Sequence, residues 1–149
     1  MSFENEPLFL LYDVARIMRT RADQSARLMG MTRAQWVIMA WVEMRPGLSQ
    51  NELAALVEVE PITVGRLVDR LEARGILERR NDPKDRRIRR LHLTGAASPV
   101  LEEIQAYRAS LNTQFADILG QSALTALTEA LAKIKAHLVE DPAASRKLG

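Results

Sequence analysis

The sequence of 149 residues contains no cysteine and only two histidines, His92 and His137. Without cysteine the chain can form no disulfide, thiolate nucleophile or cysteine-based zinc site. Two histidines are too few for a typical histidine-rich metal centre, so we expect neither a metal site nor a cofactor. The sequence also lacks a nucleophile–base motif, a glycine-rich phosphate loop and a metal-ligand cluster. We therefore expect a protein that is not an enzyme.

Long uncharged runs are also lacking. The longest runs, 91–101 and 118–128, each contain a glycine and are far too short to span a membrane. No basic and then apolar leader with a cleavage site is visible, so we expect a cytoplasmic protein that does not bind membranes. Hydrophobic residues make up 47% of the chain and charged residues 27%, which argues against wholesale disorder.

The positive charge is concentrated in one segment. The formal net charge of the chain is +2, but residues 61–90 carry ten basic and five acidic groups, whereas residues 1–60 carry six and eight. Of the 21 basic residues, 17 are arginine, whose planar guanidinium suits phosphate groups and base edges. A basic segment in a nearly neutral chain indicates a local anionic partner.

Three segments repeat apolar residues at steps of three and four, at 8–29, 101–118 and 124–138. This spacing predicts long helices. Pro7 suits the first turn of the first helix, and Gly30 is its stop signal. A helix of about 22 residues is about 33 Å long and cannot bury such a stripe alone. These three helices therefore need a partner surface.

The segment between the long helices, 31–95, begins with short helical patterns. Thr32 with Gln35, and Ser49 with Glu52, have the spacing of a capping box at a helix start. Each box is followed by apolar residues at helical spacing. We therefore expect two short helices here, with a third helix after a tight connection.

The third short helix is expected to begin at Pro61 and to stop at Gly75. After Gly75 the period changes to two, which predicts strands at 76–80 and 88–93. The residues between these strands, 81–87, are rich in turn formers and in positive charge. Together these elements form a β-hairpin with a long basic tip.

This order of elements predicts a winged helix-turn-helix, mainly α with a small β-hairpin wing (α+β). An α-helix fits the major groove of B-DNA, where each base pair displays its own donors and acceptors. In the helix from Pro61, the expected inner face consists of Val64, Leu67, Val68 and Leu71, with Val64 at the edge of this apolar stripe. The outward face presents Ile62, Thr63, Gly65, Arg66, Asp69 and Arg70.

The outward residues suggest a division of roles. Thr63 offers a hydroxyl and a methyl group, and Arg66 can contact guanine with two hydrogen bonds. Arg70 lies farther along the helix and is better placed for phosphate. At the hairpin tip, Arg86 and Arg87 suit a narrow minor groove with its enhanced negative potential. DNA would repel the carboxylate of the adjacent Asp85, so we expect it to hold a neighbouring arginine in position.

The helix at 61–75, the loop DPKDRR at 82–87 and the strand LHLT at 91–94 together resemble the MarR family of bacterial transcriptional regulators. The flanking long helices match the layout of that family as well. Ile62 and Gly65 depart from it, because small hydroxyl residues are common there. The resemblance implies that Thr63, Val64 and Arg66 lie on recognition-helix positions, and that Asp85 orients Arg87. The expected DNA-binding residues are Pro61, Thr63, Val64, Arg66, Arg70, Lys84, Asp85, Arg86 and Arg87.

The resemblance further implies a homodimer in which the first helix and the last two helices interleave, and the three unpartnered stripes agree with this. Two recognition helices would then lie about 34–36 Å apart and select a near-palindromic site. Many relatives release DNA when a small aromatic or anionic effector binds, and here Tyr12, Arg16, Trp36 and Met39 are the candidate pocket residues. The expected regions are a helical dimerisation region at 1–30 and 96–141, a winged lobe at 31–95 and a flexible tail at 142–149.

The leading hypothesis is a dimeric repressor of a near-palindromic operator that a small molecule relieves. A winged-helix module that binds proteins rather than DNA is the alternative, and the basic wing argues against it. The basic stretch 79–90 also has a simpler interpretation, as a solvated hairpin. Trp36 likewise suits core or dimer packing as well as an effector pocket.

Overall fold

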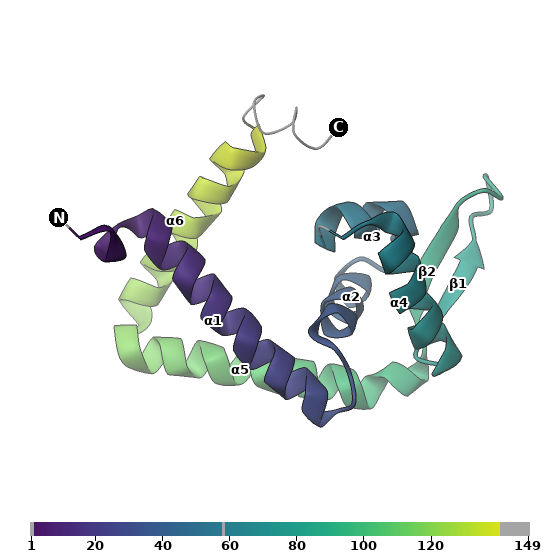
Figure 1. Ribbon diagram of the computed structural model, residues 1–149, viewed down its shortest axis with the longest axis horizontal. Coiled ribbons are helices and arrows are strands. Elements are labelled where there is room, and N and C mark those ends of the chain that lie inside the picture. The colour runs from purple at the N-terminus through teal and green to yellow at the C-terminus, as the bar shows by residue number, and fades with distance from the viewer. Residues whose placement is uncertain (1, 58, 141–149) are drawn as a thin grey trace. The chain divides into compact units, whose positions relative to one another are not determined.

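The computed structural model describes residues 2–57 and 59–140. It confirms the predicted fold class, a mainly α-helical chain with a two-stranded hairpin (Figure 1). Contacts divide the chain into two compact units, residues 1–104 and 105–149. No helix of the described ranges is long and apolar enough to cross a membrane. The elements are η1 (Phe3–Asn5), α1 (Pro7–Leu28), α2 (Arg33–Met44), α3 (Gln50–Val57), α4 (Pro61–Ala73), β1 (Leu77–Asn81), β2 (Arg89–Leu93), η2 (Gly95–Ala97), α5 (Ser98–Leu119) and α6 (Gln121–Glu140).

The two short helices start at the residues that the capping signals predict. At the start of α2, Gln35 N donates to Thr32 Oγ1 at 3.1 Å and Thr32 N donates to Gln35 Oε1 at 3.0 Å. This is a complete capping box, which satisfies two backbone donors that the helix leaves open. At the start of α3, Glu52 N donates to Ser49 Oγ at 3.1 Å.

The turn after α4 explains why the first strand begins one residue later than predicted. Gly75 has a φ of +72°, which glycine adopts without steric cost. Its N–H donates to Glu72 O at 2.9 Å, and Ile76 N donates to Leu71 O at 3.0 Å. These two bonds form a Schellman cap. Ile76 therefore completes the helix end, and β1 starts only at Leu77.

The hairpin is joined to the segment that leads into α3. β1 and β2 pair antiparallel, with Leu77 opposite Leu93 at one end of the ladder. On the other edge of β2, Gly47 N donates to Leu91 O and Leu91 N donates to Leu48 O, both at 2.9 Å. The wing is thus fixed to the start of the helix-turn-helix by backbone hydrogen bonds.

The core of the first unit lies among α2, α3, α4 and the hairpin. Helices and strands each contribute one apolar face to it, in the pattern expected for amphipathic elements. The largest fully buried side chains are Ile38, Met39, Val42, Leu53, Val64, Val68, Leu71, Leu77 and Leu91.

The second unit contains α6 and the part of α5 that follows residue 104. α5 begins at Ser98, which has helical dihedral angles. α6 has no buried residue, although it carries the predicted apolar stripe at 124–138. The predicted flexible tail at 142–149 lies outside the described residues.

Candidate nucleic-acid interface

The inner face of α4 is shifted from the predicted one. The Val64 side chain has 0% of its surface exposed, so its expected place at the edge of the apolar stripe is wrong. With 3.6 residues per turn, Val64, Val68 and Leu71 share one line, and all three are buried. Leu67 lies beside this line and is half-buried. Val64 therefore packs α4 onto the core, and its side chain is not available to contact DNA.

The other candidate residues of α4 lie on its exposed face. Pro61 occupies the first helical position, where its missing N–H costs no helical bond. Thr63, Arg66 and Arg70 are exposed. Within the described part of the chain, neither Arg66 nor Arg70 forms an ion pair, so both guanidinium groups are available to an anionic partner.

Gly65 lies where α4 meets the first turn of α3. A Cβ atom at this position would lie only 3.0 Å from Nε2 of Gln50. A side chain at residue 65 would therefore require the Gln50 amide to shift by a few tenths of an ångström.

Arg79 in β1 connects the hairpin to both helices of the helix-turn-helix. Its side chain is only 12% exposed, and its Nη2 lies 2.7 Å from Oδ1 of Asp69. Its Nη1 lies 3.2 Å from Oε1 of Glu72, and Nη2 also donates to Gln50 Oε1 at 3.2 Å and to Gly65 O at 3.3 Å. Arg79 thus sets the position of α4 relative to α3 and to the wing.

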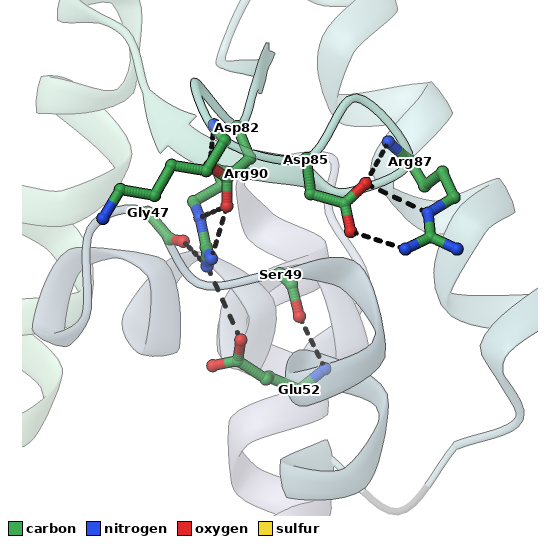
Figure 2. Close-up of polar contacts among 8 residues, drawn as sticks. Gly47, Ser49, Glu52, Asp82, Asp85, Arg87 and Arg90 are labelled. Carbon is green, nitrogen blue, oxygen red and sulfur yellow. Dashed lines mark hydrogen bonds and ion pairs between the residues drawn. The ribbon is translucent and has the colours of Figure 1, made fainter.

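The acid–arginine contact predicted in the wing is present. Arg87 donates from Nε to Oδ1 of Asp85 at 3.1 Å and from Nη2 to Oδ2 at 3.0 Å, as Figure 2 shows. Arg87 N also donates to Asp85 Oδ1 at 3.0 Å. The Arg87 side chain remains 90% exposed. A bidentate pair of this kind fixes the plane of the guanidinium while leaving its outer edge open.

The same contact changes the protonation equilibria of the pair. The side-chain hydrogen bonds from Arg87, and then its backbone N–H, hold the pKa of Asp85 below its ordinary value. The carboxylate in turn raises the pKa of Arg87. Both groups are therefore charged at neutral pH, as an oriented arginine requires.

Arg90 in β2 fixes the base of the wing. It donates to Asp82 Oδ2 from Nη2 at 2.9 Å and from Nε at 3.2 Å, and from Nη1 to Gly47 O at 3.0 Å (Figure 2). Its Nη1 also lies 3.6 Å from Oε1 of Glu52 in α3. The backbone N–H of Lys84, followed by the side chain of Arg90, lowers the pKa of Asp82. Arg90 therefore joins the wing loop, the turn before α3 and α3 itself.

A hollow of about 300 Å³ lies between the first turn of α3 and the returning limb of the wing. Arg87 and Arg89 line one side of it, and both are exposed. The first turn of a helix supplies free backbone N–H groups and a positive dipole end, which suit phosphate oxygens. The remaining lining residues are Ser49, Gln50, Asn51, Glu52 and Ile88.

The other wing candidates lie in or beside the loop between the strands. Lys84 and Arg86 are exposed, and Lys84 N donates to Asp82 Oδ1 at 2.9 Å. In the described ranges Arg86 has no ion-pair partner. The wing therefore presents Lys84, Arg86 and Arg87 as exposed cations on a loop that Asp82 and Asp85 hold in shape.

Two of the four candidate effector residues are exposed and the other two are buried. Tyr12 and Arg16 are exposed on α1, where Arg16 Nη2 forms an ion pair with Asp13 at 3.0 Å. Trp36 and Met39 are buried in the core of the first unit, with Met39 at 0% exposure. Core packing is therefore the role that the structure gives these two residues, and effector binding stays a prediction.

Sequence reasoning did not separate the structural arginines from the exposed ones. The charge pattern predicts one basic surface over 79–90, yet Arg79 and Arg90 are held by carboxylates of the same chain. One available signal was the pair Asp69 and Glu72 on α4, because acidic groups beside a DNA-binding surface need a neutralising cation.

A short helix, a turn, a second helix and an arginine-bearing hairpin define a winged helix-turn-helix protein. Residues 29–88 match the family model described as "MarR family". The winged lobe is therefore similar to the MarR family in sequence, and the chain has a winged helix-turn-helix fold.

Solved structures of related proteins have the same fold over most of the chain. The transcriptional regulator PA3341 is 29% identical, with a TM-score of 0.78 over 89% of this chain and 97% of its own. The transcriptional regulator Tm0710 from Thermotoga maritima is 28% identical, with a TM-score of 0.61 over 87% and 91%. The S. aureus MepR–DNA complex is 21% identical, with a TM-score of 0.75 over 92% and 99%.

Proposed function

We propose that the protein is a homodimeric, sequence-specific DNA-binding regulator that represses transcription at a near-palindromic operator. The observation that carries this proposal is the pair of exposed cationic elements in one compact unit. α4 presents Arg66 and Arg70 without an ion-pair partner among the described residues, and the wing presents Arg87 fixed by Asp85. Such a surface matches the phosphate backbone and the grooves of duplex DNA.

The structural arginines support the same function. Arg79 and Arg90 hold the recognition helix, the first turn of α3 and the wing in a fixed relation. A prearranged surface avoids the entropy cost of ordering the wing on binding. The solved S. aureus MepR–DNA complex has this fold as well.

The exposed apolar helices support a dimer of two identical chains. Leu127, Leu131, Ile134 and Leu138 on α6 are each at least 40% exposed, and α1 exposes a second set of large apolar residues. Folded proteins rarely leave apolar stripes of this length in water. A two-fold dimer would also place two copies of α4 on successive turns of DNA. The exposed set on α1 is Leu8, Phe9, Leu10, Leu11, Tyr12, Val14, Ile17 and Leu28.

Relief of repression by a small aromatic or anionic ligand completes the proposal. It rests on the family resemblance and on Arg16, whose exposed guanidinium suits a carboxylate. Because Trp36 and Met39 are buried, a ligand would contact them only after the surrounding helices move. Release of bound DNA on titration with an aromatic carboxylate such as benzoate tests this part, with Arg16→Ala expected to abolish the response.

Selection of bound DNA from a random pool tests the main proposal. The expected result is an inverted repeat whose half-sites are about one helical turn apart. Affinity for this DNA should fall steeply with added salt, because phosphate contacts release counterions. Recovery of no DNA, together with weak salt-independent binding, would overturn the proposal and favour a winged-helix module that binds proteins.

A further inference from the structure

We propose that Ile62 reads the C5-methyl group of a thymine in each operator half-site. This inference rests on the proposed function and assigns a specificity-determining role to a residue that the DNA-binding set above does not contain. It concerns base discrimination only, since overall affinity for DNA comes mainly from the arginines.

Ile62 is an exposed apolar residue at the start of the recognition helix. It is the second residue of α4, and 73% of its surface is exposed. The other large apolar residues of α4 are buried or half-buried. Within 31–57 and 59–95, Met44 is the only other large hydrophobic residue that is exposed.

Folding does not account for isoleucine at this position. An exposed side chain contributes little burial, and β-branched residues are poorer helix formers than alanine or the long polar residues. Apolar surface gains free energy only when another apolar group covers it. Any apolar partner of Ile62 therefore comes from outside the described contacts of the lobe.

The major groove offers an apolar group of suitable size. Among the base-edge features displayed there, the C5-methyl group of thymine is the apolar one. The N-terminal residues of a recognition helix are the ones that approach base edges. Ile62 therefore meets the chemical requirement for reading thymine, and it has no polar atom with which to read another base.

The neighbours of Ile62 place this contact within the half-site. Arg66 lies four residues later on the same face, about 6 Å along the helix. Base pairs are about 3.4 Å apart along the duplex. The thymine read by Ile62 is therefore expected within about two base pairs of the guanine read by Arg66.

The test replaces thymine by uracil, which lacks only the methyl group, at single positions of the selected operator. For the wild-type protein, one position in each half-site should weaken binding by about fourfold, the value of one buried methyl-sized group. For Ile62→Ala, the same replacement should change affinity by less than about 1.5-fold, because the methyl group has lost its partner.

Met44→Ala is the matched control, because it also removes an exposed apolar side chain of the lobe but lies outside the recognition helix. It should retain the wild-type response to uracil. Circular dichroism and thermal unfolding should be unchanged in both variants, since both side chains are exposed. A methyl effect that persists in Ile62→Ala, or disappears in Met44→Ala, would overturn the assignment.

The binding experiments distinguish a failure of this inference from a failure of the proposed function. Salt-dependent binding to an inverted repeat with no response to uracil at any position would reject the role of Ile62 and leave the regulator proposal intact. Loss of all specific DNA binding by the wild-type protein would reject both.

Discussion

The winged lobe, residues 31–95, buries most of its large apolar residues, whereas the last helix, α6, buries none of its own. In the lobe, α4 and the hairpin bury most of theirs, as Val68 and Leu91 illustrate with 0% exposure. In α6, Leu131 and Ile134 stay 40% and 45% exposed. A similar amphipathic pattern in the sequence thus packs into the core of the lobe but is available to a partner on α6. Apolar periodicity predicts that a face will be covered, but it does not tell by which chain.

The largest expected effect comes from placing a charge on the exposed apolar face of α6. Ile134→Asp places a charge in the proposed dimer contact, which should cost about 3 kcal/mol or more and weaken the dimer by at least about 100-fold. Ala136→Asp introduces the same charge on the opposite side of α6 and should leave the dimer intact. Sedimentation velocity at micromolar concentration distinguishes the two. If both variants remain dimeric, α6 does not form the contact.

The next largest effect concerns the stability of the winged lobe. Arg79→Ala leaves the carboxylates of Asp69 and Glu72 without their shared cation, and we expect a loss of about 1–3 kcal/mol in the free energy of unfolding. Arg80→Ala, in the same strand, breaks only an exposed contact to Glu78 and should cost less than about 0.5 kcal/mol. Urea denaturation measures both. Equal losses would show that Arg79 does not hold the lobe together.

The exposed arginines of the lobe should divide by role. Arg66→Ala should reduce discrimination between operator and mismatched DNA by about 1–3 kcal/mol, whereas Arg70→Ala should weaken binding to all sequences alike. Competition binding with matched and mutated operators measures the difference. A uniform loss in both variants would contradict this division.

The wing should contribute a smaller, fold-independent effect. Arg87→Ala should lower DNA affinity about tenfold with no change in the melting temperature, because its side chain is 90% exposed. Arg108→Ala in α5 removes the same charge outside the lobe and should bind DNA as the wild type does. Unchanged affinity of Arg87→Ala at physiological salt would reject the wing assignment.

The smallest effect is the pH dependence of the wing carboxylates. Their pKa values are lower in the folded protein than the ordinary value of about 4, so the folded state binds fewer protons there. The stabilisation is present above about pH 4 and is lost as the pH falls through the folded pKa values. The double variant Asp82→Asn, Asp85→Asn should show a flatter decline of melting temperature below pH 4. An identical decline in variant and wild type would show that these two carboxylates do not contribute to the loss of stability in acid.

Much of the fold could be predicted because local signals determine it. Thr32 with Gln35 and Gly75 act within one or two helical turns, so their spacing in the sequence is sufficient. The Asp85–Arg87 contact is likewise two residues apart. The links from Arg79 could not be predicted in this way, because they depend on how α4 packs against α3 and the hairpin. Long-range packing decides which arginine is structural and which is exposed.

The missing side chain at Gly65 has a consequence for attempts to redirect the protein to a new operator. A longer residue there would push against Gln50 Nε2, and Gln50 also accepts from Arg79. Changing residue 65 alone would therefore displace the Gln50 amide and disturb its hydrogen bond with Arg79 of β1. Engineers seeking altered base preference should therefore leave this position alone and vary Ile62 and Thr63.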